Sequence, residues 1–231
     1  MILLVLTCPR PQPRLAFTLQ ALDAQAWSGS RVVWSDGPID ASAIPPESGW
    51  EVVYRDRIGP PNTHPYFDAV SMCKGHDVLV VEDDVEVTPG ALRYIQRAGA
   101  PSNLAYVSWF DPLCRMPVSV PAVRFFRADE VIPCQARTIP RESIDAMIEY
   151  RGSSDFDAGL GADGAMAAAF AGQLAAVHVP SLFQHVGAAS AANPGADLSG
   201  YRVSETFRPT LDVSRAFAHV NPADLLRLQG R

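Results

Sequence analysis

The chain has 231 residues, of which 48% are hydrophobic and 19% are charged, and this composition is ample for one α/β domain with a packed core. Its formal net charge of −6 argues against a general electrostatic grip on nucleic acid or an anionic membrane, although arginines could still gather in a local basic groove. The four cysteines are widely spaced and form no Cys-x-x-Cys pair. This spacing argues against a zinc site or a disulfide framework and favours reduced thiols in a cytoplasmic protein.

The apolar start "MILLVLTCPRP" predicts a buried strand at residues 2–6 and not a secretion signal, because it lacks a basic n-region and a small-residue cleavage site. No apolar run approaches the ~20 residues of a membrane span. Further strands are expected at 31–34, 51–54, 77–81 and 104–109, with helices at 15–25, 64–74 and 89–98. The last of these helices is predicted from Thr88 as its N-cap and Pro89 as its first residue.

This alternation of short apolar strands with helices predicts an α/β fold, in which helices flank a mostly parallel sheet. Such sheets bind their ligands at the carboxyl ends of the strands. That edge would carry Thr7 to Arg10, Asp36, and Glu82 to Asp84. The sequence therefore places several polar groups where a ligand would bind.

The second half of the chain is less regular. Strands are expected within 122–127, 130–139 and 174–179, and helices at 140–150, 162–171 and from 222 onward. Residues 187–200 are rich in glycine, alanine, serine and asparagine, which is typical of a surface loop and also fits a lid that orders over a ligand. No linker divides the chain, so we expect a single domain over residues 1–231.

Three adjacent acids, Glu82, Asp83 and Asp84, follow the apolar run "VLVV". Side chains alternate between the faces of a strand, so Glu82 and Asp84 should share one side, with Asp83 on the other. A divalent cation bound to a diphosphate would relieve the repulsion among these carboxylates, since Mg²⁺ and Mn²⁺ take oxygen ligands. The alternative is a solvated turn, with Asp84 to Glu86 favouring the N-terminus of the next helix.

The stretch "VLVVEDDVEVTPGALRYI" is similar to the metal-binding segment of GT-A glycosyltransferases, where a strand ends in a Glu-Asp-Asp version of the DxD motif. The resemblance is greatest to the N-acetylglucosaminyltransferases of N-glycan processing. "VLTCPRP" resembles the first strand and turn of that family, and "WSDGP" resembles the end of its second strand. "VPSLFQHVGAAS" resembles its Pro-Ser-Leu-x-Gln-His-x-Gly segment. These pieces occur in family order between residue 2 and about residue 190.

The resemblance implies a role for each matching residue on the donor side. Asp84 would bind the metal, and Asp83 and Glu82 would face the ribose and the transferred sugar. The other implied donor contacts are Asp36 on the base, Thr7 and Cys8 lining its slot, Arg10 near the base or diphosphate, and His185 at the metal or diphosphate. Each of three residues has a plainer interpretation: Arg10 as a surface arginine, Asp36 as a turn former, and His185 as a hydrogen-bonded structural histidine.

An inverting transfer also needs a general base that takes the proton of the acceptor hydroxyl. In the family, this acid precedes the Pro-Ser-Leu segment, near the start of a helix. Asp155, Asp157 and Asp163 fit that description, and the spacing of Asp163 to Pro180 matches best, with Asp157 second. The alternative for Asp163 is an acid that only stabilises the N-terminus of its helix.

The resemblance therefore implies a metal-dependent, inverting glycosyltransferase that takes a nucleotide sugar, with a UDP-sugar as the expected donor and Mn²⁺ or Mg²⁺ as the cation. Residues 1–110 would form the nucleotide-sugar half, and residues 111–231 would form the acceptor half. Because the chain is short and shows no anchor or stem, a bacterial or phage protein in the cytoplasm fits better than a Golgi enzyme.

The acceptor stays open among a glycan, a lipid-linked sugar, a protein, a small metabolite and a hydroxymethylated base of phage DNA. Five arginines of the second half could line a DNA groove, although solvated surface charge is their simplest interpretation: Arg115, Arg124, Arg127, Arg137 and Arg141. Two other functions compete. A nucleotidyltransferase would usually show a Gly-rich basic loop after the first strand, and "TCPRPQPR" has no glycine. An inactive nucleotide-sugar-binding module would not need all of the acids.

Overall fold

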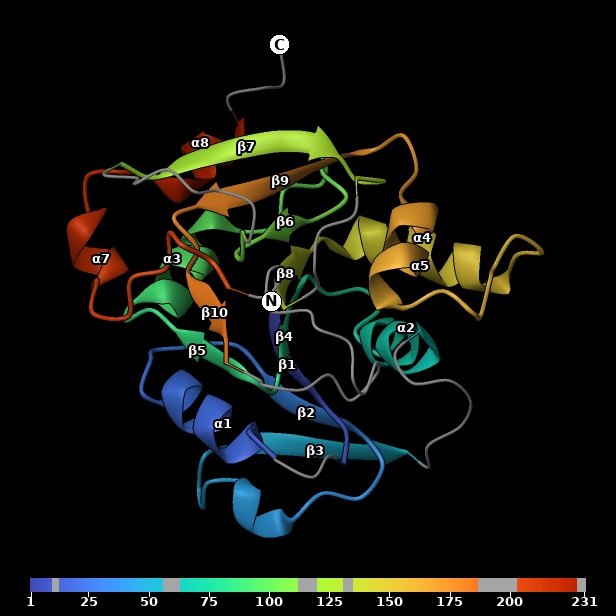
Figure 1. Ribbon diagram of the computed structural model, residues 1–231, viewed down its shortest axis with the longest axis horizontal. Coiled ribbons are helices and arrows are strands. Elements are labelled where there is room, and N and C mark those ends of the chain that lie inside the picture. Colours follow the sequence, from blue (N-terminus) through green and yellow to red (C-terminus); the bar gives the residue numbers. More distant parts are fainter. Residues whose placement is uncertain (10–12, 56–62, 112–119, 131–134, 187–202, 228–231) are drawn as a thin grey trace.

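The computed structural model describes residues 1–9, 13–55, 63–111, 120–130, 135–186 and 203–227. Its centre is an eight-stranded mixed sheet in the order β3-β2-β1-β4-β8-β6-β9-β7, which runs from the bottom to the top of Figure 1. The strands of this sheet are β1 (Ile2–Thr7), β2 (Arg31–Asp36), β3 (Trp50–Arg55), β4 (Val78–Glu82), β6 (Val107–Ser108), β7 (Ala122–Arg127), β8 (Ala136–Ile139) and β9 (Leu174–Val179). The predicted α/β class is confirmed.

The first four strands are parallel, as the alternation of strand and helix predicts. β8 then pairs antiparallel with both β4 and β6, so β6 runs in the same direction as β4. β9 is parallel to β6, and β7 closes the sheet as an antiparallel edge strand. The carboxyl ends of β1, β2, β3, β4, β6 and β9 therefore lie along one edge of the sheet.

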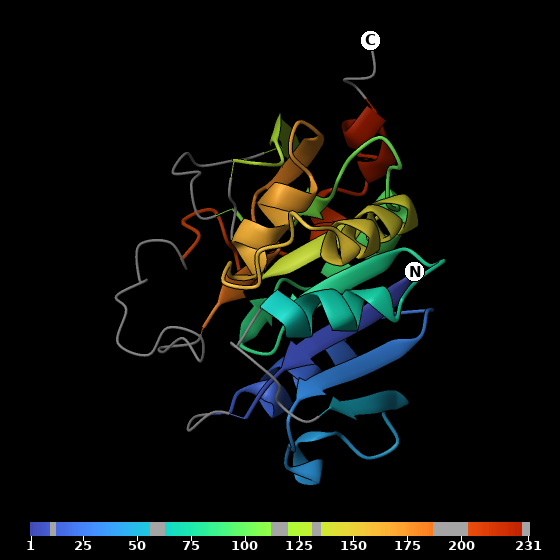
Figure 2. The ribbon, with the colours of Figure 1, turned by 90° about the vertical axis from the view of Figure 1, so that its right-hand side faces the viewer.

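Helices cover both faces of the sheet. One face carries α2 (Thr63–Ser71), α4 (Arg141–Gly152) and α5 (Ala162–Ala169), which lie in front of the strands in Figure 2. The other face carries α1 (Leu15–Asp23), α3 (Ala91–Ala98), α7 (Val213–Ala216) and α8 (Pro222–Arg227). A short 3-10 helix, η1 (Ala41–Ala43), connects β2 to β3. Each face has its own apolar core, because strand side chains alternate between the two.

A second, two-stranded sheet was not predicted from the sequence. β5 (Val85–Val87) pairs antiparallel with β10 (Phe183–His185), so a segment next to the acids joins one about 100 residues later in the chain. β5 displaces the start of the following helix. α3 begins at Ala91 after Gly90, and no side chain caps it, so the predicted Thr88 N-cap is wrong. Thr88 instead donates its backbone N–H to the carbonyl oxygen of Leu182.

Gly90 makes this displaced start possible. Its φ of 77° lies in the left-handed region that favours glycine. A Cβ at this position would also lie 2.9 Å from atoms of Asp212 and Ser214 at the start of α7. The strand predicted at 104–109 is likewise shorter than expected, since only Val107–Ser108 is extended within the sheet before the chain turns at its carboxyl edge.

Candidate functional site

The acids at the end of β4 converge with a histidine from β10. Glu82, Asp84 and His185 each offer one ligand atom, and these atoms all lie within 4.8 Å of one another. Nε2 of His185 is 3.1 Å from a carboxylate oxygen of Asp84, and both side chains are buried. We call this group the acid–histidine triad. The predicted common side of Glu82 and Asp84 agrees with this geometry, whereas the roles of Asp84 and His185 at a metal stay predictions.

The pairing of β5 with β10 brings His185 to the acids. His185 lies opposite Val85 in this pairing, one residue beyond Asp84. The backbone N–H of Val186 extends the contact by donating to the carbonyl oxygen of Asp84 at 2.8 Å. The triad therefore joins residues that are far apart in the sequence through ordinary backbone hydrogen bonds.

Asp83 lies on the opposite side of the turn, as strand alternation predicts. Its carboxylate accepts a hydrogen bond from the hydroxyl of Thr7, at the end of β1. Thr18 on α1, which sequence reasoning missed, holds the backbone of the same turn. Its hydroxyl lies 2.8 Å from the carbonyl oxygen of Asp83 and accepts the N–H of Val85 at 3.2 Å. This contact could not be predicted from the spacing of apolar residues, because that spacing only assigns Thr18 to the buried face of the helix.

Asp36 ends β2 and is buried, so it is more than an exposed turn former. Nε of Arg55 lies 3.1 Å from its carboxylate, and the same guanidinium pairs with Asp68 of α2. The Arg55 guanidinium carbon lies 5.0 Å from the ring centroid of Trp34, within the range of a cation–π contact. This network fixes a carboxylate at the carboxyl edge of the sheet, two strands away from β4.

Other predicted donor contacts are described only in part. Cys8 follows β1 directly and is partly exposed, next to Thr7. Arg10 lies outside the described residues, and so does the 187–200 segment that was predicted as a surface loop or a lid.

Asp163 lies in the first turn of α5, as predicted, and its side chain is 40% exposed. Nη2 of Arg137, on β8, is 3.7 Å from its carboxylate. Arg137 itself is buried, with its guanidinium carbon 4.3 Å from the ring centroid of Tyr106. The expectation of solvated surface charge is therefore wrong for Arg137, because an acid and an aromatic ring compensate its burial.

The two other candidate bases lie in the exposed segment before α5. Asp157 accepts a hydrogen bond from the N–H of Gly159 at 2.8 Å, and the backbone N–H of Asp155 donates to the hydroxyl oxygen of Ser153 at 3.3 Å. Both arrangements are local turns between nearby residues. Of the three candidates, Asp163 alone contacts a side chain of the central sheet among the described residues.

The described arginines of the possible DNA groove are all paired with acids. The pairs are Arg124 with Asp111, Arg127 with Asp129, Arg137 with Asp163, and Arg141 with Glu142. Arg115 lies outside the described residues. Since each paired guanidinium is already partly neutralised, these four side chains form no strongly positive surface for a phosphate backbone.

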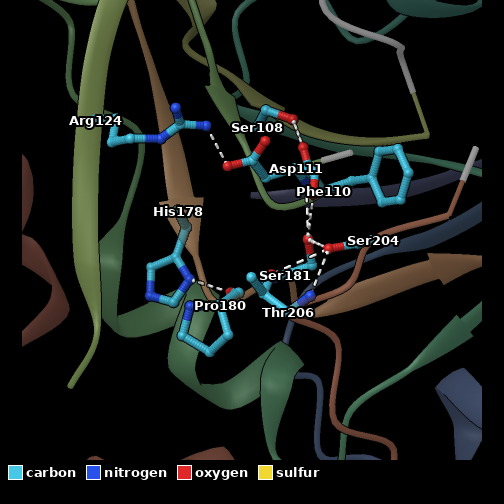
Figure 3. A network of polar contacts seen from close by, with 9 residues as sticks. All are labelled: Ser108, Phe110, Asp111, Arg124, His178, Pro180, Ser181, Ser204 and Thr206. Carbon is cyan, nitrogen blue, oxygen red and sulfur yellow. Dashed lines mark hydrogen bonds and ion pairs between the residues drawn. The ribbon is translucent and has the colours of Figure 1, made fainter. Parts of the chain in front are cut away.

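A further polar network, which sequence reasoning missed, lies at the ends of β6 and β9 (Figure 3). The Ser181 hydroxyl accepts the N–H of Asp111 at 2.7 Å and contacts the hydroxyl of Ser204 at 2.7 Å. Thr206 accepts the N–H of Ser181 at 3.0 Å. The carboxylate of Asp111 is fully buried and pairs with Arg124 of β7. We call Asp111, Ser181, Ser204 and Thr206 the hydroxyl network, which ties the C-terminal segment to the sheet.

His178 of β9 is buried beside this network. Its Nδ1 lies 2.8 Å from the carbonyl oxygen of Pro180, and its Nε2 lies 3.2 Å from the hydroxyl of Tyr94 (the first contact is drawn in Figure 3). Burial lowers the pKa of His178 to about 4, although the hydrogen bond to Pro180 opposes this shift. The imidazole is therefore neutral at physiological pH.

An apolar groove of about 590 Å³ lies away from these residues, between α1, β5, α3 and α7. Phe17, Val87 and Arg93 are among its lining residues, and none of the predicted site residues that the structure describes lines it. The groove is therefore a feature separate from the acid–histidine triad.

The sequence matches no protein-family model and no curated protein sequence. Among solved structures, the chain is similar to the galactosyltransferase LgtC in complex with donor and acceptor sugar analogues. The TM-score is 0.51 at 10% identity, over 91% of this chain and 85% of that one. The fold is a GT-A fold. This confirms the expected architecture of a mostly parallel sheet flanked by helices.

Two further structures are similar to this chain over a smaller share of their own length. The Staphylococcus aureus TarS fragment 1–349 has a TM-score of 0.49 at 15% identity, over 77% of this chain and 58% of that one. The glycosyltransferase GlyE of Streptococcus pneumoniae TIGR4 has a TM-score of 0.49 at 10% identity, over 76% and 44%. The chain thus spans about half the length of these two GT-A proteins. None of its described helices is long and apolar enough to cross a membrane.

Proposed function

We propose that the chain is a metal-dependent glycosyltransferase that moves a sugar from a nucleotide-sugar donor, expected to be a UDP-sugar, to a hydroxyl acceptor. The observation that carries this proposal is the convergence of Glu82, Asp84 and His185 at the carboxyl edge of the sheet. Ligands of open α/β sheets bind at this edge, and two carboxylates beside an imidazole there offer ligand atoms for a cation.

The ligand atoms of the triad fit a divalent cation. Two carboxylates and one imidazole provide oxygen and nitrogen ligands within a span of 4.8 Å. Mg²⁺ prefers oxygen ligands and retains waters, whereas Mn²⁺ also accepts imidazole, so the histidine favours Mn²⁺. When bound, such a cation neutralises the charge that develops on a nucleoside-diphosphate leaving group.

The ends of β1 and β2 would hold the nucleotide. Asp36 presents a buried carboxylate, which accepts a hydrogen bond from a base N–H such as the imide of uracil. Arg55 keeps this carboxylate in place through its ion pair. Thr7 and Cys8 would line the same slot, and Asp83, held by Thr7, would face the ribose. The predicted contact of Arg10 with the base or diphosphate is part of the same proposal.

Asp163 would act as the general base of an inverting transfer, with Asp157 as the second candidate. The Asp163 side chain is 40% exposed, so an acceptor hydroxyl can reach it. The guanidinium of Arg137 contacts this carboxylate at 3.7 Å and connects it to the central sheet. As for the acceptor, the acid-paired arginines favour the hydroxyl of a glycan, lipid-linked sugar, protein or metabolite over a modified DNA base.

A thermal-shift assay with UDP, with and without Mn²⁺, tests the donor site. At a UDP concentration about 100-fold above Kd, binding stabilises the fold by about 2.7 kcal/mol, which raises the Tm by about 5–10 °C. We expect this rise only when Mn²⁺ is present. Asp84→Asn should abolish it. Asp145→Asn, which changes an exposed carboxylate on α4, should retain it.

Other responses would support the competing functions. Stabilisation by nucleoside triphosphates and not by UDP would favour a nucleotidyltransferase. An equal response of wild type and Asp84→Asn would remove the triad from donor binding. The absence of a response to every nucleotide would contradict the proposal.

A further inference from the structure

Gln135, directly before β8, is a buried polar residue to which neither the sequence nor the proposed function assigns a role. The residue is 6% exposed, and its side-chain oxygen has no hydrogen-bond partner among the residues that the structure describes. Buried polar atoms nearly always have partners in native proteins, so such an amide oxygen requires an explanation. A ligand that donates a hydrogen bond would supply one.

The backbone places Gln135 next to the acid–histidine triad. Its carbonyl oxygen accepts the N–H of Glu82 at 2.9 Å, which extends the β4–β8 pairing of Val81 with Ala136 by one residue. Residues directly opposite each other in an antiparallel pair share a face of the sheet. The side chain of Gln135 therefore lies on the same face as that of Glu82.

The candidate base Asp163 lies on the same face of the sheet. Arg137 follows Gln135 by two residues and so also points to this face, where its guanidinium lies 3.7 Å from the carboxylate of Asp163. Along one strand, residues two apart are separated by about 6–7 Å. Gln135 thus lies between two parts of the proposed site. Its neighbour on the adjacent strand is Glu82 of the triad, and the next side chain on its own side of β8 is Arg137, which contacts Asp163.

We propose that Gln135 binds a hydroxyl group of the transferred sugar and thereby helps to select it. This inference rests on the proposed function. If the triad holds the diphosphate and Asp163 activates the acceptor, the sugar ring must lie between them, because it joins the phosphate and is attacked at its anomeric carbon. The Gln135 amide oxygen then accepts a hydrogen bond from a sugar O–H. A site built around such a hydrogen bond discriminates strongly against sugars that cannot make it.

Calorimetric titration in the presence of Mn²⁺ tests this assignment. The quantity to compare is the ratio of Kd for a UDP-sugar to Kd for UDP, measured with UDP-glucose, UDP-galactose and UDP-GlcNAc. For Gln135→Leu, we expect the Kd of UDP to stay within about twofold of wild type and the ratio for the preferred sugar to rise about tenfold. Gln135→Asn, which keeps an amide but shortens its reach, should shift the ratio in the same direction and serves if the leucine variant does not fold.

Gln25→Leu is the matched control. The Gln25 side-chain oxygen accepts the N–H of Leu92 on the opposite face of the sheet, so its loss should leave the ratio unchanged. An unchanged ratio in both folded Gln135 variants would overturn the inference, and so would an equal loss of UDP and UDP-sugar affinity. Failure of wild type to bind UDP would instead contradict the proposed function itself.

Discussion

The acid–histidine triad and the hydroxyl network are both buried polar clusters at the carboxyl edge of the sheet, but their chemistry is opposite. The triad gathers carboxylate oxygens and an imidazole nitrogen, groups that could together ligate a divalent cation. The hydroxyl network alternates donors and acceptors, so that Ser181, Ser204 and Thr206 satisfy one another within the protein. The balance of donors and acceptors, and not burial alone, separates a candidate ligand site from a structural network.

The largest expected effect is the loss of sugar transfer in Asp163→Asn, which tests whether Asp163 is the general base. Asp163→Asn keeps the size of the side chain but removes its basicity, so we expect sugar transfer to fall by about 10²–10⁴-fold. UDP release from the UDP-sugar measures transfer, and the Mn²⁺-dependent Tm rise with UDP should persist because the triad is intact.

Asp157→Asn is the comparison for this prediction. If Asp157→Asn loses transfer while Asp163→Asn retains it, the base is Asp157. Near-wild-type transfer in both variants would remove Asp157 and Asp163 from the base role and leave Asp155 as the remaining candidate.

A smaller effect is expected at the hydroxyl network, and it should concern stability alone. Ser181→Ala leaves the buried N–H of Asp111 without its acceptor, which should lower the free energy of unfolding by about 2 kcal/mol. Chemical denaturation measures this change, and the Mn²⁺-dependent Tm rise with UDP should remain. Loss of that rise in a folded Ser181→Ala variant would show that the network is part of the ligand site after all.

The smallest expected effect is a pH dependence of stability from His178. Its pKa is about 4 in the folded chain and about 6.5 when unfolded, so below pH 6.5 the unfolded state binds more protons. Stability is then lost as the pH falls from 6.5 towards 4, and lowering the pH from 7 to 5.5 should cost about 1 kcal/mol. Denaturation of wild type and His178→Gln at both values measures this difference. His219→Gln, which changes an exposed histidine, should keep the wild-type dependence.

The position of the acids in the candidate site was predictable because its signals are local. The run "VLVV" predicts a buried strand, and the acids that follow it must then lie at the carboxyl edge. His185 was found through the resemblance of its segment to a known family, since a single histidine carries no signal of its own.

The contacts that complete the site were not predictable, because they depend on pairing between distant segments. β5 and β10 have three residues each, too few for a periodic pattern. The antiparallel insertion of β8 between β4 and β6 places Gln135 beside Glu82, and an alternation of strands and helices does not predict a reversed strand. The contacts of Thr18 and Arg137 were missed for the same reason, since their partners lie 65 and 26 residues away in the chain.

The pairing of β5 with β10 also bears on how the protein is made. During synthesis, Glu82 and Asp84 leave the ribosome well before the strand that carries His185, and β5 has its partner only after β10 has been added. A three-ligand centre therefore cannot form on a nascent N-terminal half. If the triad binds a cation as proposed, that ion would link the end of β4 to β10 and close a loop of about 100 residues.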